Sequence, residues 1–211
     1  MKKTVITIAR SYGSGGRTLG KLLAEQLGIN CYDREILRMA SDASGINEAL
    51  FGQADERLKR SPLFGILKKN PYKGGVIPPE NSDFVSDDNL FNYQAKVIKE
   101  LAEQESCVII GRCADYLLSD HDNVLRVFIH APLEFRRQRM KSYCLGMSDR
   151  EILKKIHDCD KRRSEYYHYY TGDDWRDVTH EDLSLDSSRD GIEGCAEKII
   201  RSIPVLLGIE P

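Results

Sequence analysis

The sequence predicts an α/β fold in which a parallel sheet lies between layers of helices. Short apolar segments typical of strands alternate along the chain with longer segments of helical periodicity. The segment Cys107–Ile110 is apolar throughout, as expected of a strand that helices cover on both faces. Because strands separated by helices pair in parallel, this alternation favours one sheet with a helical layer on each side.

The first elements follow from short residue patterns. Residues 4–8 are β-branched and apolar, which predicts a strand. Leucines at helical spacing predict a helix over residues 18–27, and Gly28 directly after it suits a helix C-cap. A short second strand is then expected at residues 29–32, followed by a helix at 34–40.

The middle of the chain combines an irregular stretch with regular elements. Residues 60–88 hold most of the prolines and a Gly-Gly pair, which predicts an irregular, mobile insertion. Apolar residues at helical spacing predict a helix at 89–105. A further apolar run predicts a strand at 124–129, and Pro132 fits the first turn of a helix over 132–143.

The last elements repeat the same alternation. Ser148 and Glu151 form the sequence pattern of a capping box, which predicts a helix to about residue 169. A short strand is expected at residues 183–185 and a closing helix, with apolar residues on one face, at 191–207.

Length and composition limit the classes of function. A chain of 211 residues, 41% hydrophobic and 30% charged, is expected to form one domain. Its net charge of −2 argues against broad binding of nucleic acid or of an anionic membrane. No apolar run approaches the roughly 20 residues of a membrane span, and no signal-peptide pattern opens the chain. The six cysteines lack metal-binding spacing and are expected to be reduced and mostly buried, so a cytoplasmic protein is predicted.

A glycine-rich loop follows the first predicted strand. Gly13, Gly15 and Gly16 precede a predicted helix, and glycine allows positive φ and close approach of a ligand to the backbone. Consecutive N–H groups can then converge on an anion at the helix N-terminus. We therefore predict a site for nucleotide phosphates. The residues assigned to it are Arg10, Gly13, Ser14, Gly15, Gly16, Arg17 and Thr18.

This loop departs from the usual phosphate-binding pattern at its cationic position. In the pattern G-x-x-x-x-G-K-[ST] a lysine follows the last glycine, whereas this chain has Gly16 there and Arg10 at the first glycine position. The nearest cation, Arg17, comes one position late. Two other interpretations remain open: a dinucleotide-binding turn in which Asp33 would bind a ribose, and a turn that binds nothing.

Two other predicted strands also end in polar residues that could bind a ligand. Arg112 follows the strand 107–110, where its guanidinium could donate two hydrogen bonds to a phosphate, or could pair with an acid such as Asp115. Asp33 and Arg34 follow the second strand, where they could bind a nucleoside and a phosphate, or could be an N-cap and its solvated neighbour.

Two successive predicted helices are rich in basic residues. Arg136 and Arg139 share a face of the first, and Asp160 and Arg163 share a face of the second. Such residues usually form solvated faces, but next to a phosphate loop we interpret them as a closing lid whose arginines stabilise a transferring phosphoryl group. The aromatic segment 166–170 is interpreted as packing. The predicted catalytic residues are Arg17, Arg136, Arg139 and Arg163.

Several motifs, taken together, resemble the cytidylate kinase-like family. Residues 13–18 are similar to the G-S-G-K-G-T loop of cytidylate kinases. Further similar motifs lie, in matching order, at residues 32–37, 110–112, 127–132, 182–183 and 187–188. The resemblance covers nearly the whole chain. It implies a P-loop nucleoside monophosphate kinase: a three-layer fold with a parallel five-stranded sheet, an insertion that binds the monophosphate and a helical lid.

The resemblance also implies a division of one domain, residues 1–211, and a set of ligands. The core would comprise about residues 1–33, 89–135 and 180–211, the insertion about 34–88 and the lid about 136–175. The activity would be ATP-dependent phosphorylation of CMP or dCMP, with Mg²⁺ and small nucleotides as ligands. The chain has no acid after the strand 107–110 to hold a metal, so Mg²⁺ is expected near Thr18 without an assigned carboxylate. The acceptor would be bound by Asp33, Arg34, Arg112 and Asp115.

Two further hypotheses compete with an active kinase. The missing lysine favours a nucleotide-binding sensor or regulatory protein that has lost turnover, and a structural domain without a ligand is the third possibility. Arg112 and the predicted lid arginines favour the kinase. The oligomeric state does not follow from the sequence.

Overall fold

The computed structural model describes residues 3–57 and 72–207. Within these ranges, five parallel strands form one sheet, as the sequence predicts. The strands are β1 (Val5–Arg10), β2 (Asn30–Tyr32), β3 (Cys107–Ile110), β4 (Val124–His130) and β5 (Leu183–Asp186). The helices are α1 (Gly16–Leu27), α2 (Glu35–Ser44), α3 (Glu48–Arg57), α4 (Asp87–Gln104), α5 (Ala114–Leu117), α6 (Leu133–Lys141), α7 (Asp149–Thr171) and α8 (Ser187–Leu207).

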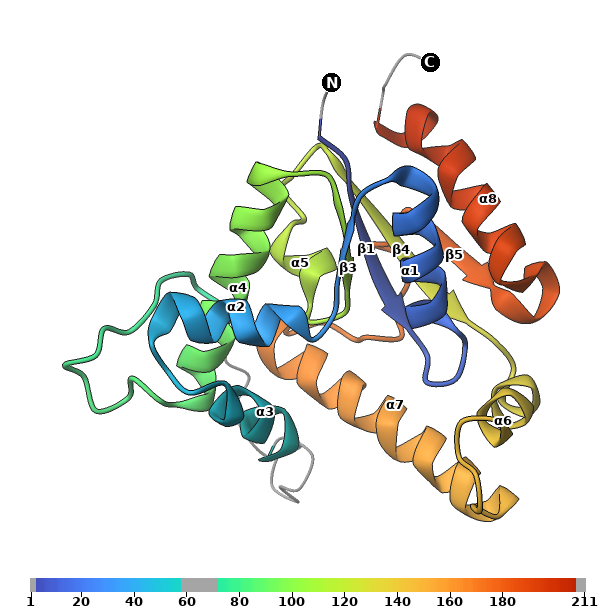
Figure 1. Cartoon of the computed structure of the whole chain (residues 1–211), viewed down its shortest axis with the longest axis horizontal. Helices are drawn as coiled ribbons and strands as arrows, with labels where there is room; N and C mark the ends of the chain where they lie inside the picture. The colour runs from blue at the N-terminus through green and yellow to red at the C-terminus, as the bar shows by residue number, and fades with distance from the viewer. Residues whose placement is uncertain (1–2, 58–71, 208–211) are drawn as a thin grey trace.

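The order of the strands brings the predicted ligand-binding segments together. The sheet runs β2-β3-β1-β4-β5, so β1 is central and β3 is its neighbour. Ile8 of β1 is in register with Ile110 of β3, and the loops that follow these strands leave the sheet side by side. In Figure 1, α7 runs across the carboxyl ends of the strands, the edge at which open α/β sheets bind ligands.

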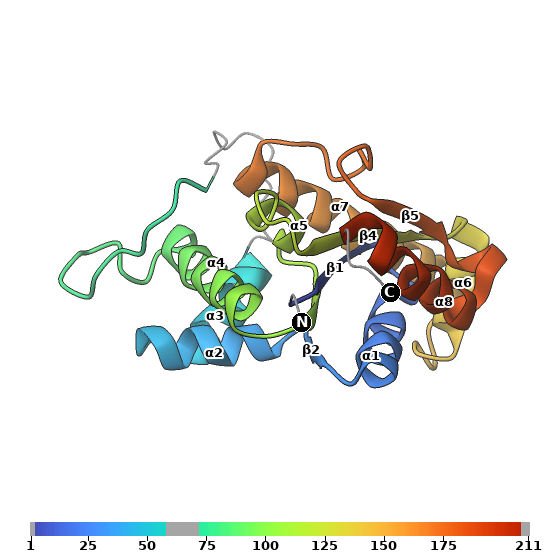
Figure 2. The same cartoon turned by 90° about the horizontal axis from the view of Figure 1, so that it is seen from above.

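Two apolar layers enclose the sheet. Ile8 and Ile110 face the layer formed with α1 and α8, whereas Val5 and Ile109 face the layer formed with α2, α4 and α7. Figure 2 shows α1 and α8 on one side of the sheet and α5 and α7 on the other. Because neighbouring residues of β3 enter opposite layers, all four of its positions are buried and apolar.

The structure adds three features that the sequence patterns did not predict. α3 lies before the irregular stretch predicted at 60–88, within the insertion that the family resemblance implies, and its Phe51 and Ala54, three residues apart, are buried. α5 is a single turn, too short to show periodicity. α8 begins four residues earlier than expected and is interrupted at Gly191, whose φ of 68° and ψ of 178° are not helical.

Other local predictions agree with the structure. Ser148 and Glu151 form the predicted capping box of α7, and Gly28 is the C-cap of α1. Residues 72–86 form neither helix nor strand, as expected of the insertion, while 60–71 lie outside the described residues.

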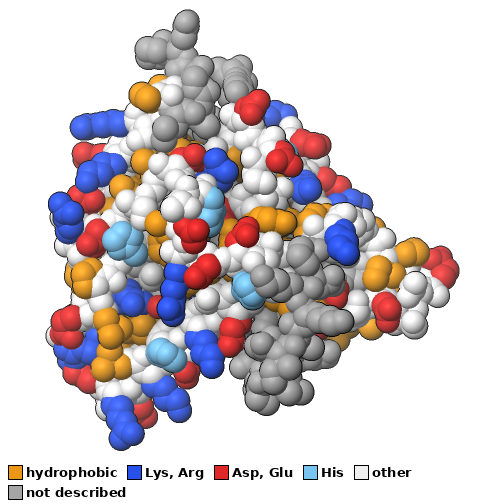
Figure 3. Space-filling view, turned by 180° about the vertical axis from the view of Figure 1, so that it is seen from behind, with side chains coloured by type: hydrophobic (Ala, Val, Ile, Leu, Met, Phe, Trp, Pro, Cys, Tyr) orange, Lys and Arg blue, Asp and Glu red, His pale blue; other side chains and the backbone are white. Residues whose placement is uncertain are grey.

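The charge distribution on the surface and the state of the cysteines agree with the expectations from the composition. Positive and negative side chains are interspersed on the face seen in Figure 3, in keeping with a net charge near zero. None of the helices in the described part of the chain is both long and apolar enough to span a membrane. All six cysteines are free thiols, of which four are buried.

Candidate phosphate-binding and transfer site

The predicted phosphate loop connects β1 to α1 at the middle of the sheet. Gly13 and Gly15 have φ values of 84° and 93°, which explains why glycine occupies both positions. α1 begins at Gly16, directly after the loop, so the free N–H groups of its first turn face the loop's concave side. This is the arrangement in which a helix N-terminus binds a phosphate.

The loop is held in shape from beneath by two serines. The Ser14 hydroxyl is buried and donates to the carbonyl oxygens of Ser11 and Ile129, at 2.8 and 3.0 Å. Ser187, at the start of α8, donates in turn to the carbonyl oxygen of Ser14 at 2.6 Å. The side chain of Ser14 therefore supports the loop, while the loop's outer surface stays open to a ligand.

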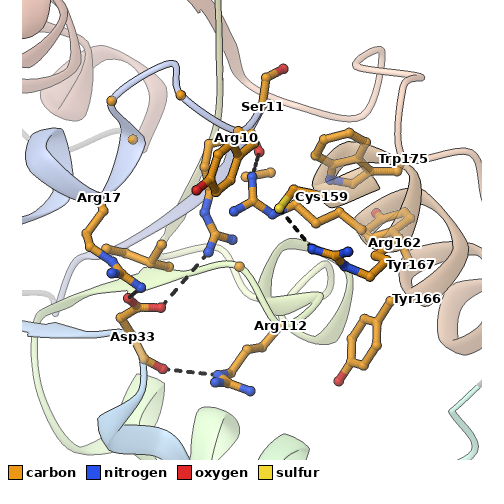
Figure 4. Close-up of a pocket in the computed structure, with 18 of the residues that line it drawn as sticks. Arg10, Ser11, Arg17, Asp33, Arg112, Cys159, Arg162, Tyr166, Tyr167 and Trp175 are labelled. Atoms are coloured by element: carbon orange, nitrogen blue, oxygen red, sulfur yellow. Dashed lines mark hydrogen bonds and ion pairs between the residues drawn. The ribbon is translucent and has the colours of Figure 1, made fainter. Parts of the chain in front are cut away.

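A cavity of about 560 Å³ extends from this loop to the ends of β2 and β3. Its wall is strongly basic. The arginines that line it are Arg10, Arg17, Arg34, Arg112, Arg139, Arg162 and Arg163, and the acids are Asp33 and Asp115. Figure 4 shows side chains from the phosphate loop, from β2 and β3, and from α7 converging on this space. Seven guanidinium groups and two carboxylates at one cavity fit an anionic ligand with several phosphates.

Asp33 links the loop to the end of β2. One of its carboxylate oxygens lies 2.5 Å from Nη2 of Arg17, and the other lies 4.0 Å from Nη2 of Arg10. The N-cap of α2 is Arg34, so the interpretation of Asp33 as a helix cap is wrong. Asp33 instead faces the cavity, and Arg34 is exposed on its rim.

Arg112 is held at the end of β3 in an unusual backbone conformation. Its φ is 60°, in the left-handed region that non-glycine residues seldom adopt. Its guanidinium donates from Nη1 to Gln94 Oε1 at 2.7 Å and from Nε to the carbonyl oxygen of Asp33 at 3.0 Å. These contacts orient the guanidinium toward the cavity, and strain of this kind is typical of functional positions.

Asp115 lies deeper, in a buried polar cluster beneath the cavity. It accepts a hydrogen bond of 2.7 Å from the hydroxyl of Tyr167, which is also 3.2 Å from Nε2 of His180. Nε2 of His180 lies 4.0 Å from Glu181 Oε1, whereas Glu181 Oε2 is buried without a hydrogen-bond partner among the described residues. Burial, followed by the nearby charge of Asp115, raises the pKa of Glu181 to about 8. Asp115 is thus tied to α7 through Tyr167.

The two basic helices are docked on the phosphate loop. Asp160 of α7 accepts from the backbone N–H of Tyr12 at 2.7 Å and pairs with Arg136 of α6 at 2.5 Å. Arg163 donates to the carbonyl oxygen of Arg10 at 2.7 Å, and Arg139 reaches the hydroxyl of Thr18 at 3.2 Å. The loop and both helices therefore form one connected unit.

The predicted catalytic arginines differ in their surroundings. Arg17, Arg139 and Arg163 line the cavity, whereas Arg136 is engaged behind the loop by Asp160 and by the carbonyl oxygen of Tyr12. A catalytic role for each of them stays a prediction.

Four residues of the site were not assigned to it from the sequence. Asp160 was placed on the same face as Arg163, but nothing in the pattern indicated that it would bind the loop backbone. Arg162 was one member of a basic run, Gln94 lies among the core residues of α4, and Tyr167 belongs to the aromatic segment that was interpreted as packing. The positions of these side chains depend on tertiary packing, which local spacing does not report.

A parallel sheet of order 2-3-1-4-5, with a glycine-rich loop between its first strand and first helix, defines a fold of the P-loop class. Residues 5–189 match the cytidylate kinase-like family. The chain belongs to this family.

Curated and structural relatives support the assignment. The chain is 29% identical over 185 residues to a cytidylate kinase of Methanosarcina mazei, covering 87% of each chain. It is 25% identical over 193 residues to a cytidylate kinase of Pyrococcus horikoshii, covering 91% of this chain and 84% of the relative. A crystal structure of an uncharacterised protein from Eubacterium ventriosum superposes with a TM-score of 0.68 at 25% identity, covering 95% of this chain and 98% of that one.

Proposed function

We propose that the protein transfers the γ-phosphoryl group of ATP to a nucleoside monophosphate, with CMP or dCMP as the preferred acceptor. The observation that carries this proposal is the single cavity that joins the phosphate loop to arginines from two strand ends and two helices. A catalyst of phosphoryl transfer must hold donor and acceptor phosphates together and neutralise their charge. The choice of cytosine as the base of the acceptor rests on the curated relatives, which are named cytidylate kinases.

The loop side of the cavity would bind ATP. Backbone N–H groups from Gly13 to Thr18 would hold its phosphates, with the lid arginines above them. The Thr18 hydroxyl faces this space, and Mg²⁺ binds readily through one or two protein oxygens together with substrate phosphates, so the residues present fit that ion. When bound, Mg²⁺ would neutralise phosphate charge. Asp33 and Asp115 are the carboxylates among the described residues that line the cavity.

The strand ends on the other side would bind the acceptor. Arg112 would hold its phosphate, while Asp33, Arg34 and Asp115 would contact the nucleoside. In the transfer, an oxygen of the acceptor phosphate bonds to the γ-phosphorus as the bond from that phosphorus to the bridging oxygen breaks. The electron pair of the broken bond stays on ADP. The described residues 34–57 and 72–88 would lie over the acceptor, and the segment 136–175 would lie over the donor.

A direct assay tests this proposal. The protein is incubated with Mg-ATP and a panel of mononucleotides, and ADP release is measured. We expect turnover with CMP and dCMP above the other acceptors. The proposal would be contradicted if no acceptor of the panel gave ADP above the rate with ATP alone.

The substitution Arg112→Ala tests whether the acceptor and ATP bind to different halves of the cavity. We expect KM for the acceptor to rise about 10- to 100-fold, the scale of a lost charged hydrogen bond, with ATP affinity nearly unchanged. Arg201→Ala is the matched control, because the Arg201 side chain is exposed on α8. The kinetics of this variant should match those of the unmodified protein. Equal losses of ATP and acceptor affinity would show that Arg112 does not belong to the acceptor side.

A nucleotide sensor is the second candidate, because Gly16 stands where active P-loop enzymes carry lysine. Tight binding of ATP without turnover of any acceptor would favour the sensor over the kinase.

A further inference from the structure

The two departures of the phosphate loop from its usual pattern are in contact with each other. Gly16 stands at the lysine position and Arg10 at the first glycine position. A Cβ atom added to Gly16 would lie 2.7 Å from Cβ and 2.9 Å from Cγ of Arg10. Carbon atoms without a bond between them do not approach so closely. A side chain at position 16 and the side chain of Arg10 therefore exclude each other.

A second glycine accommodates the other end of the same arginine. A Cβ atom on Gly111 would overlap Nη1 of Arg10 and lie 3.0 Å from its Cζ. Gly111 follows β3, and β3 pairs with β1, the strand that ends at Arg10. The Arg10 side chain thus passes Gly16 with its stem and reaches the end of β3 with its guanidinium.

The guanidinium of Arg10 lies where positive charge is in excess. The carboxylate of Asp33 faces this guanidinium at 4.0 Å. Arg163 donates a hydrogen bond to the backbone carbonyl oxygen of Arg10, and Arg17 and Arg112 line the same cavity. Burial, together with the surrounding arginines, lowers the pKa of Arg10. A phosphate in the cavity would supply the negative charge that balances this cluster.

We propose that Arg10 takes the place of the missing loop lysine as the cation that contacts the transferring phosphoryl group. Gly16 is glycine because the stem of Arg10 occupies the space beside it, whereas Gly111 is also favoured as glycine by its φ of 70°. This proposal rests on the phosphotransferase function proposed above. A guanidinium can hold two phosphate oxygens at once, whereas a lysine ammonium acts as a single point charge.

A reciprocal exchange tests the proposal. Arg10→Ala should lower kcat about a hundredfold or more, the scale for removing a preorganised charge. Gly16→Lys alone should lower the melting temperature, because the new side chain meets Arg10. The double variant Arg10→Gly/Gly16→Lys also removes the Cβ of residue 10, which an alanine there would keep 2.7 Å from the new side chain. It should melt above Gly16→Lys and regain at least about tenfold of the kcat lost in Arg10→Ala, since lysine then has the vacated space.

Two matched controls isolate the effect. Gly194→Lys places the same new side chain on α8, where a Cβ meets its nearest neighbour, Asp190 Cβ, at an ordinary 3.6 Å. Arg201→Ala removes an exposed arginine from the same helix. Both should keep the activity of the unmodified protein. The proposal is overturned if Arg10→Ala stays within a few fold of the unmodified kcat, or if the double variant is no more active than Arg10→Ala.

Failure of the proposed function would be recognised separately. If the unmodified protein turns over no acceptor, the kinase proposal fails, and the affinity for the non-hydrolysable analogue AMP-PNP decides the role of Arg10. Loss of affinity in Arg10→Ala and recovery in the double variant would support Arg10 as the phosphate-binding cation. Equal AMP-PNP affinity in all variants would overturn it.

Discussion

Glu181 is a carboxyl group that folding buries with one oxygen unpartnered. Asp115, His180, Arg126 and Asp182 all act on it electrostatically, but burial has the largest effect and raises its pKa to about 8. Its side chain is 1% exposed, so solvent screening is weak. The native protein therefore holds a proton on Glu181 at pH values where the unfolded chain has lost it.

The free energy of unfolding should consequently depend on pH through this one group. Between about pH 4.5 and 8 the native state binds the extra proton, so stability falls as pH rises, by up to about 1.4 kcal/mol per pH unit. Glu181→Gln removes this dependence. Urea unfolding of both proteins at pH 5 and pH 8 should show the variant gaining about 2–4 kcal/mol relative to the unmodified protein at the higher pH. The same change in the free energy of unfolding between pH 5 and pH 8 in both proteins would show that burial does not raise the pKa of Glu181.

At the residue scale, the sequence revealed backbone features better than side-chain pairings. Gly13 and Gly15 were identified because a loop that needs positive φ has few alternatives to glycine. The pair of Asp33 with Arg17 and the hydrogen bond from Arg112 to Gln94 join different elements. No local pattern indicates which of several acids or amides a given arginine will meet.

At the scale of elements, α7 is the largest structural contributor to the site. It supplies Asp160, which binds the loop backbone and Arg136, and Tyr167, which binds Asp115. One helix of 23 residues thus touches both of the halves proposed to bind the donor and the acceptor. Its capping box was visible in the sequence because it is local, whereas its docking on the loop is not.

Removing the Asp160 carboxylate should loosen this docking. Asp160→Ala loses the hydrogen bond to Tyr12 N–H and the ion pair with Arg136, so we expect KM for ATP to rise about tenfold or more. Amide hydrogen exchange of α7 near residue 160 should become faster in the same variant. Asp158→Ala, two residues away and half-exposed, is the control. Unchanged exchange and unchanged KM would show that α7 docks by other contacts.

At the scale of the whole molecule, the two-layer core could be predicted and the site's charge balance could not. Alternation of strands and helices, with β3 apolar at every position, was sufficient to indicate a parallel sheet covered on both faces. α3 and α5 were missed because one is mostly polar and the other is a single turn. The cavity requires segments more than 100 residues apart to meet, which only the assembled sheet defines.

Ligand binding across this cavity should stabilise the entire domain. AMP-PNP at about 100 times its Kd should add about 2.7 kcal/mol to the free energy of unfolding. For a chain of 211 residues that corresponds to a rise in Tm of about 5–10 °C. AMP-PNP together with CMP should raise Tm further than either ligand alone, as scanning calorimetry can measure. An unchanged Tm at saturating ligand would contradict nucleotide binding at this cavity.

The hydrogen bond from Ser187 to Ser14 spans 173 positions of the chain. Ile192, on the same helix, lies against Gly15. During synthesis the phosphate loop therefore leaves the ribosome well before Ser187 and Ile192, which support it from beneath. Until then the loop lacks its final hydrogen bond, and β4 lacks its neighbour β5. The nascent chain is thus unable to complete this loop until α8 has been made.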